Sequence, residues 1–189
     1  MDDTPRKREQ QKWAWVLTGS GHFFDESLDI MGTLDDCDVF LSKAAEEVLR
    51  MYRHRGRIFR EGITVYRDTT ASAAPVGQFY KGYYHTLVMA PVSSNTVAKC
   101  AYGISDNLAT NVFAQAGKCR VPAIVFACDT APELETMAPK GLVKVYPRRI
   151  DLENVAKLRE FERTTVVEGM ADLEKAIAER REWLSASSS

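Results

Sequence analysis

APVSSNTVAKCAYGISDNLATN, residues 90–111, is the stretch that decides the fold, because it joins an apolar strand to a helix through small hydroxyl and amide side chains. Residues 86–90 predict a buried strand that ends at Pro91, and residues 93–96 favour the first turn of a helix. Such a first turn carries unpaired N–H groups and a partial positive charge, which favour phosphate. The junction therefore predicts either an anion site or a simple helix cap.

Two further junctions of the same kind occur nearer the start of the chain. The apolar run 13–17 ends in TGSGH, residues 18–22, and the short strand 38–41 ends at Ser42; a helical pattern follows each. The GSG turn lacks the third glycine and the glycine–lysine pair of the nucleotide-loop signatures, so alone it is a weak motif. Three serine-bearing strand-to-helix turns fit one crevice at the switch point of a parallel sheet. The sequence therefore predicts one phosphate-bearing cofactor.

The composition is that of an ordinary soluble globular protein. The chain has 189 residues, of which 45% are hydrophobic and 27% charged, and this predicts a single domain over residues 1–189 with flexible ends at 1–12 and 185–189. The net charge of −1 argues against a nucleic-acid partner, although residues 53–60 form a basic run that is either a solvated helix end or a docking patch. No apolar stretch approaches the roughly 20 residues of a membrane span. We expect no membrane association and a cytoplasmic location.

Cysteine and histidine usage indicates neither a zinc site nor a disulfide framework, so no metal is expected. The four cysteines are widely spaced and the chain has three histidines. Buried inert thiols are the expected state. Cys128 follows the apolar run 123–127, at the end of a predicted strand where a ligand site would lie, so it is either a functional thiol or a small buried residue.

The order of predicted elements alternates strand with helix. A third strand is expected at 63–66, a long loop at 68–77, and further strands at 123–127 and 142–146. Residues 152–184 predict two amphipathic helices, the second with an apolar stripe facing either the sheet or a neighbouring subunit. Alternating strand–helix units predict an α/β fold: a three-layer, Rossmann-like (flavodoxin-like) parallel sheet with helices on both faces.

Four motifs together resemble a known family. TGSG at 18–21, Ser42 followed by KAA, PVSSNTVAK and GISDNLATN are similar to the flavoproteins with FMN-binding, cysteine-decarboxylase-type Rossmann folds, over about residues 13–146. The resemblance implies that the FMN phosphate lies against the GSG turn and Ser42, with the ribityl chain and ring along residues 93–96. Asp106 and Asn107 match the D-N pair of the family, which either touches the flavin or braces its loop. With His22 beside the turn and Cys128 at its strand end, the candidate FMN-binding residues are Gly19, Ser20, Gly21, His22, Ser42, Ser93, Ser94, Asn95, Thr96, Asp106, Asn107 and Cys128.

The chain departs from the decarboxylases at two places. Those enzymes carry a histidine before the strand that leads to the serine cluster, where this chain has Val76, Gly77 and Gln78. They also carry P-x-M-N-x-x-M after the fifth strand, where residues 127–133 read ACDTAPE. His85 aligns with a different position. Decarboxylation of a peptidyl cysteine is therefore not expected.

Within the family, FACDTAPE and the long PVGQFY-to-ATN stretch look most like the archaeal-type dihydromethanopterin reductases. This resemblance implies an FMN-dependent oxidoreductase that passes a hydride from flavin N5 to C6 of a 7,8-dihydropterin, while a proton goes to pterin N5. The electron donor would be NAD(P)H or a ferredoxin-like iron–sulfur protein, in a ping-pong scheme. Two alternatives stay open: an electron-transfer flavoprotein without an organic substrate, and a flavin prenyltransferase-like enzyme.

The catalytic group is not identified by the sequence. Asp129, after the fifth strand, is a candidate to contact the pterin or move the proton, but an aspartate there is also typical of a turn or helix cap. The family resemblance further implies a homo-oligomer built from trimers, with FMN near subunit contacts.

Overall fold

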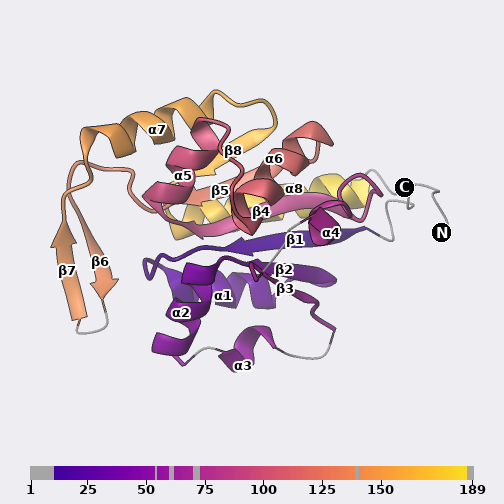
Figure 1. Ribbon diagram of the computed structural model, residues 1–189, viewed down its shortest axis with the longest axis horizontal. Helices are drawn as coiled ribbons and strands as arrows, with labels where there is room; N and C mark the ends of the chain where they lie inside the picture. Colours follow the sequence, from indigo (N-terminus) through magenta and orange to yellow (C-terminus); the bar gives the residue numbers. More distant parts are fainter. Residues whose placement is uncertain (1–10, 54, 60–61, 70–72, 139–140, 187–189) are drawn as a thin grey trace.

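A six-stranded parallel sheet forms the centre of the molecule, in the strand order β3-β2-β1-β4-β5-β8 (Figure 1). The computed structural model describes residues 11–186 except 54, 60–61, 70–72 and 139–140. The strands of this sheet are β1 (Lys12–Leu17), β2 (Cys37–Leu41), β3 (Val65–Arg67), β4 (Tyr84–Val92), β5 (Ala123–Ala127) and β8 (Thr164–Val167). The chain builds outward from β1 to β3 and then returns to place β4 on the other side of β1. The switch point therefore lies between β1 and β4.

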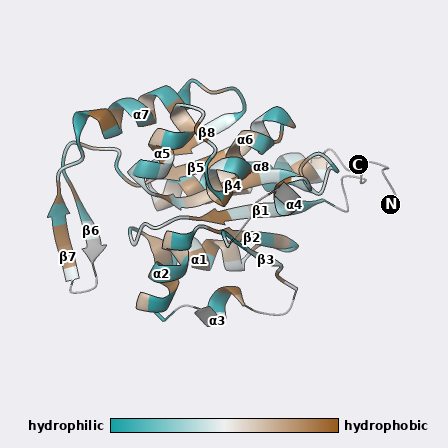
Figure 2. Ribbon diagram, viewed as in Figure 1, coloured by the Kyte–Doolittle hydropathy of each residue, from teal (hydrophilic) through white to brown (hydrophobic). Residues whose placement is uncertain are grey.

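Helices cover both faces of the sheet, as predicted for an α/β fold. They are α1 (Phe24–Gly32), α2 (Lys43–Met51), α3 (Arg55–Ile58), α4 (Ala73–Val76), α5 (Ser94–Ala101), α6 (Leu108–Lys118), α7 (Arg149–Arg159) and α8 (Met170–Ala186). One buried cluster joins the sheet to α1, α2, α3 and α8, and a second joins it to α4, α5, α6 and α7. Figure 2 shows apolar residues on the strands and polar residues on the outer sides of the helices. The predicted three-layer, flavodoxin-like fold is confirmed.

The side chains of β1 alternate between the two buried clusters, so both faces of the sheet must be covered by helices. Trp13, Trp15 and Leu17 pack into one cluster, while Ala14 and Val16 pack into the other. Successive side chains of a strand point to opposite faces, so a strand that is apolar at every position is buried on both sides.

Strand β4 continues past the point where the sequence predicts its end. Pro91 lies inside the strand, and Val92 pairs with Ala127 of β5 after an irregularity in the register. Proline cannot donate a hydrogen bond to a neighbouring strand. The Pro91 carbonyl oxygen instead accepts a hydrogen bond from Thr18 Oγ1 at 2.9 Å. A side chain from the loop after β1 therefore holds this part of β4 in place.

The strand expected at 142–146 is not part of the main sheet. Residues Gly141–Val145 form β7, which pairs antiparallel with β6 (Leu134–Ala138) in a hairpin that extends away from the sheet (Figure 1). Strands β6 and β8 were not predicted from the sequence, and β3, expected at 63–66, lies at Val65–Arg67. These strands are short and half exposed, so their apolar pattern is weak.

The ends of the described chain are more regular than predicted. Lys12 is the first residue of β1, and α8 extends to Ala186. Ser185 Oγ donates to the Arg181 carbonyl at 3.0 Å, which is compatible with continued helix. The remaining residues of the expected flexible ends, 1–10 and 187–189, lie outside the described residues.

The apolar stripe of α8 faces the sheet. Leu173 and Ile177 are buried in the cluster on that face, with Met170 and Leu184 packed against it. Arg180 adds polar contacts, since its guanidinium group donates to Thr86 Oγ1 at 2.8 Å. Among the helices that the structure describes, none is long and apolar enough to cross a membrane.

The turn after β1 packs tightly against the start of α2. A Cβ atom added at Gly19 would lie 2.4 Å from Ala44 Cβ. Both atoms are attached directly to backbone, so no rotamer change could separate them. Glycine at position 19 is therefore what allows the turn and helix α2 to meet.

We predict that Gly19→Ala forces the turn away from α2 and lowers the free energy of unfolding by about 1–3 kcal/mol, measured by urea denaturation. Gly117→Ala in α6 is the matched control, because an added Cβ there meets nothing within 4 Å and alanine is the better helix former. A Gly19→Ala variant as stable as the native protein would contradict this account of the turn.

Candidate functional site

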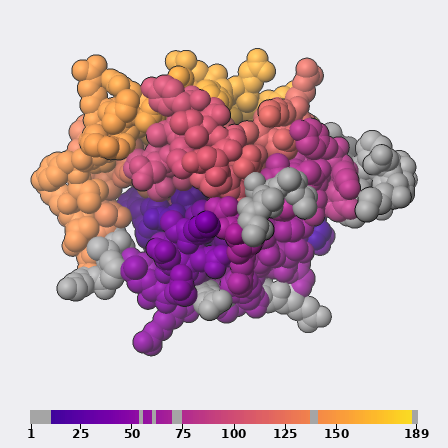
Figure 3. All heavy atoms as spheres, viewed as in Figure 1, coloured from indigo at the N-terminus to yellow at the C-terminus, as the bar shows by residue number. Residues whose placement is uncertain are grey.

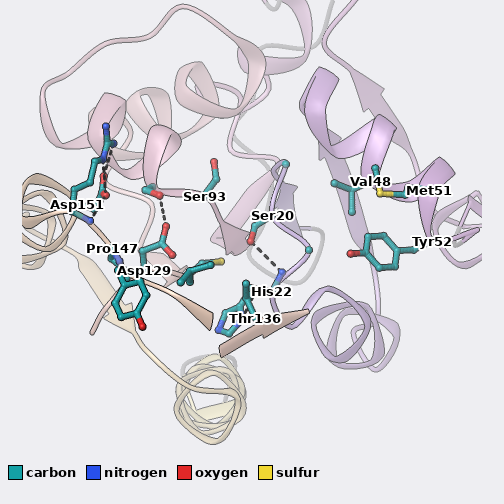
Figure 4. A pocket seen from close by; sticks show the side chains of 17 residues that line it. Ser20, His22, Val48, Met51, Tyr52, Ser93, Asp129, Thr136, Pro147 and Asp151 are labelled. Atoms are coloured by element: carbon teal, nitrogen blue, oxygen red, sulfur yellow. Dashed lines mark hydrogen bonds and ion pairs between the residues drawn. The ribbon is translucent and has the colours of Figure 1, made fainter. Parts of the chain in front are cut away.

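A cavity of about 580 Å³ opens where the carboxyl ends of β1, β4 and β5 meet. This volume is in the range of small-molecule sites. Figure 3 shows the surface hollowed between the β6–β7 hairpin and the N-terminal part of the chain. The lining residues are Gly19, Ser20, Gly21, His22, Val48, Met51, Tyr52, Ser93, Ser94, Cys128, Asp129, Thr136, Val145, Tyr146, Pro147, Arg148 and Asp151. In Figure 4, Val48, Met51 and Tyr52 lie on one side of the cavity, whereas Asp129, Pro147 and Asp151 lie on the other.

Thr18 joins the two turns at the switch point. Its hydroxyl group donates to the Pro91 carbonyl at 2.9 Å and accepts from the Ser93 backbone N–H, also at 2.9 Å. Thr18 is 1% exposed, so both bonds are shielded from water. The glycine–serine turn and the start of α5 are consequently held together as one wall of the cavity.

The start of α5 borders the cavity through Ser93 and Ser94. Ser93 occupies the N-cap position, but its hydroxyl contacts Thr96 Oγ1 at 3.2 Å without capping a backbone N–H. The first N–H groups of a helix have no partner within the helix. Together with the helix dipole, they make this edge of the cavity suited to an anionic or strongly polar ligand.

Asp129 borders the cavity and accepts a hydrogen bond from Ser94 Oγ (Figure 4). It does not cap a helix, since the chain continues from Asp129 into β6 and the next helix, α7, begins at Arg149. The helix-cap alternative is therefore wrong, and the carboxyl group of Asp129 connects the end of β5 to the start of α5.

His22 connects the glycine–serine turn to the hairpin. Its Nδ1 lies 3.1 Å from Thr136 Oγ1 of β6, and its backbone N–H donates to Ser20 Oγ at 3.2 Å. Burial lowers the pKa of His22 below its usual value, although the charges of Asp129 and Glu26 oppose this shift. The imidazole is therefore mainly neutral at pH 7.

Cys128 lines the cavity as a protonated thiol. Burial raises its pKa to about 12, so the nucleophilic thiolate is scarce at neutral pH. Its backbone N–H donates to the Val92 carbonyl at 3.1 Å, which extends the pairing of β4 with β5. The structure shows no disulfide bond at any of the four cysteines, Cys37, Cys100, Cys119 and Cys128.

Three of the predicted cofactor residues lie near the cavity without lining it. Ser42 caps α2, its hydroxyl accepting from the Ala45 N–H at 3.1 Å. Asn95 is exposed and Thr96 half-buried in the first turn of α5. Ser42 remains next to the glycine turn, because its own N–H donates to the Leu17 carbonyl at 3.2 Å.

Asp106 and Asn107 brace the loop before α6. Asp106 accepts from Lys99 Nζ at 2.7 Å and from the Asn107 side-chain amide at 3.0 Å. The hydrogen bond from Lys99 holds the pKa of Asp106 below its usual range. Asn107 forms a capping box with Thr110. Neither residue lines the cavity, so the structure favours the bracing alternative.

Several parts of the cavity lining were not predicted. They come from α2, from Thr136 and from the segment that leads into α7. Arg148 and Asp151 pair at 2.8 Å, and the Arg148 backbone N–H also donates to Asp151. The sequence does carry one signal for this pair: Asp151 follows Arg148, the N-cap residue of α7, by three positions, which is the spacing of a capping box. Among the described residues, no group of three histidine, cysteine or acidic side chains could hold a metal ion.

A parallel sheet with a ligand cavity at its switch point, bordered by a glycine–serine turn and a helix start, defines a Rossmann-like fold of the flavodoxin type. The model of the Flavoprotein family matches residues 1–185, and the chain belongs to this family. The family predicted from the sequence motifs is thereby confirmed.

Three relatives place the chain within this family. It is 37% identical to an uncharacterized protein of Methanocaldococcus jannaschii over 88% of this chain and 94% of that protein. It is 39% identical to a dihydromethanopterin reductase (acceptor) of Methanosarcina mazei, over 70% of this chain and 61% of the reductase. The crystal structure of Burkholderia xenovorans DmrB in complex with FMN, described as a cubic protein cage for redox transfer, is 49% identical with a TM-score of 0.85. That match covers 93% of this chain and 98% of DmrB.

We predict that a thiol reagent at pH 8 modifies Cys119 in the native FMN-free protein, while Cys128 stays unmodified until the protein unfolds. Cys119 is half-buried, whereas Cys128 is 5% exposed with a pKa near 12. Peptide mass spectrometry after timed labelling measures both rates. Labelling of Cys128 as fast as Cys119 would contradict the interpretation of Cys128 as an inert thiol.

Proposed function

We propose that the chain binds FMN in the cavity at the switch point. The 49% identity with FMN-bound DmrB over nearly the whole of both chains supports this proposal most strongly. The donor set fits as well. N–H groups of the glycine–serine turn and the first turn of α5 suit a phosphate, and hydroxyl groups of Ser20, Ser93 and Ser94 suit the ribityl chain. We keep Ser42 among the residues proposed to bind the phosphate, because it lies beside the glycine–serine turn.

We infer further that the protein is an FMN-dependent oxidoreductase that reduces a 7,8-dihydropterin, as the dihydromethanopterin reductases named among its relatives indicate. Bound reduced FMN would supply a hydride to C6 of the N5=C6 imine, and pterin N5 would gain a proton. The electron donor would be NAD(P)H or a ferredoxin-like protein. The chain spans 61% of the Methanosarcina mazei reductase, so the proposal concerns the chemistry of this domain.

Asp129 is the proposed source of the proton. Burial affects two titratable neighbours of Asp129 in the lining: it lowers the pKa of His22, and it keeps the proton on the Cys128 thiol. Asp151 is paired with Arg148, which lowers its pKa. Asp129 has no cationic partner at hydrogen-bond distance among the described residues, and its carboxyl group holds the Ser94 hydroxyl. A proton that Asp129 takes up from solvent during the reaction can therefore pass to a substrate directly or through Ser94 Oγ.

We also propose that the protein is cytoplasmic and forms a homo-oligomer. DmrB forms a cubic cage, and assembly from trimers agrees with such symmetry. Exposed apolar side chains on the hairpin and at the start of α7 are available for contacts between copies; they are Leu142, Val143, Tyr146 and Ile150.

An anaerobic spectroscopic experiment tests the proposed function. The purified protein should show a flavin spectrum that bleaches on addition of a nicotinamide or iron–sulfur donor and returns on addition of a 7,8-dihydropterin. A flavin that is reduced but never reoxidised by any dihydropterin would contradict the reductase proposal and favour electron transfer. Failure to bind FMN after reconstitution would overturn the cofactor assignment.

We predict that Asp129→Asn slows reoxidation of the reduced flavin by the dihydropterin by about 100-fold, while reduction of the flavin by its donor changes little. Only the pterin step consumes the proton that Asp129 is proposed to supply. Stopped-flow absorbance separates these two half-reactions. Asp172→Asn on α8 is the control, since Asp172 is exposed and lies outside the cavity lining. Equal reoxidation rates in Asp129→Asn and the native protein would contradict the role of Asp129.

A further inference from the structure

A second cavity, of about 310 Å³, lies beside the first and shares Gly21, His22 and Tyr52 with it. Its lining is aromatic and acidic: Gly21, His22, Phe23, Phe24, Asp25, Glu26, Tyr52, Glu135 and Leu142. We propose that this cavity receives the pyrimidine ring of the pterin and that Glu26 accepts hydrogen bonds from its N–H edge. This inference rests on the proposed function. The shared wall brings a ligand in the second cavity next to a ligand in the first.

The aromatic part of the lining is held in place by an unusual backbone conformation. Phe23 has φ 49° and ψ 34°, a left-handed conformation that is uncommon for a bulky residue. Its carbonyl accepts from the Ser27 N–H at 3.0 Å, and its ring lies 4.2 Å from the His22 ring, centre to centre. The Phe23 side chain is nevertheless 36% exposed. Strained residues of this kind concentrate at functional sites, and an exposed, fixed ring can stack on a flat heterocycle.

The acidic part of the lining matches one edge of a pterin. The 2-amino group and N3–H of the pyrimidine ring are adjacent donors that point the same way. A carboxylate has two acceptor oxygens and can receive both hydrogen bonds, which are strengthened by its charge. A cavity that combines aromatic rings with a carboxylate therefore suits a 2-amino-4-oxopyrimidine better than it suits a phosphate or a carboxylate ligand.

Of the three carboxylates in the lining, Glu26 is best placed to accept hydrogen bonds from the 2-amino group and N3–H of the pterin. Asp25 is paired with Arg57 at 2.9 Å. Glu135 lies on β6 of the exposed hairpin, outside the main domain, and Lys144 opposite it is paired with Glu133. Glu26 lies in the first turn of α1, close enough to His22 for its charge to act on the imidazole. Its position on a helix of the main domain, next to the wall shared with the first cavity, makes it the recognition residue.

Steady-state kinetics of the FMN-loaded protein test this assignment with two substrates, a 7,8-dihydropterin and its analogue that lacks the 2-amino group. We expect Glu26→Gln to raise KM for the dihydropterin by roughly tenfold, with kcat, FMN content and flavin reduction by the donor little changed. KM for the analogue should change much less, because the analogue cannot form one of the two bonds. Glu174→Gln, an exposed position on α8, is the control.

The outcomes separate the two proposals. If the native protein reduces the dihydropterin and Glu26→Gln leaves KM unchanged, or changes it equally for both substrates, the recognition site is wrong and the proposed function stands. If the native protein binds FMN but reduces no dihydropterin, the proposed function fails, and this assignment fails with it.

A second variant tests the stacking surface independently of charge. Phe23→Asn keeps a residue that tolerates the left-handed conformation and removes the ring. We expect a several-fold rise in KM for both substrates, because both stack through the same ring system. An unchanged KM for both would overturn the placement of the pterin against Phe23.

Discussion

The hydroxyl group of Thr18 is the contact on which the site depends. It bridges the carbonyl of Pro91 and the N–H of Ser93 across the switch point of the sheet. One buried side chain thereby satisfies an acceptor of β4 and a donor of the turn that leads into α5, and buried groups of this kind are costly to leave unpaired. The bridge sets the distance between the glycine–serine turn and α5, and hence the width of the cavity.

The two cavities place the proposed cofactor and substrate sites beside a buried and an exposed part of the chain, respectively. The wall formed at the ends of β1, β4 and β5 belongs to the centre of the sheet, where these strands are almost fully buried. The β6–β7 hairpin contributes Thr136 and Val145 to the first cavity and Glu135 and Leu142 to the second. Its second strand is mostly exposed, and Thr136 contacts His22 of the main domain. If the flavin binds beside the buried strands and the substrate beside the exposed hairpin, as proposed, substrates could exchange while the flavin stays bound.

The sequence predicted those parts of the molecule that depend on local pattern. The apolar runs of β1, β2 and β5 identify central strands, and the serine cluster identifies the start of α5, because burial on both faces and helix capping leave a local signal. The continuation of β4 through Pro91 could not be predicted, since it depends on Thr18, 73 positions away. The hairpin wall depends on Thr136 meeting His22 across 114 positions, and its exposed strands lack an apolar period. Asp106 and Asn107 were recognised as a motif, but their bracing role appears only in the contact with Lys99.

A crystal structure of this protein grown with FMN would test the central claim most directly. We expect electron density for the phosphate against Gly19, Ser20 and Gly21, with the remainder of the cofactor between Ser93 and Asp129 and its ring bordering His22. FMN bound with its phosphate at any other place on the chain, leaving the cavity at the switch point empty, would contradict the account.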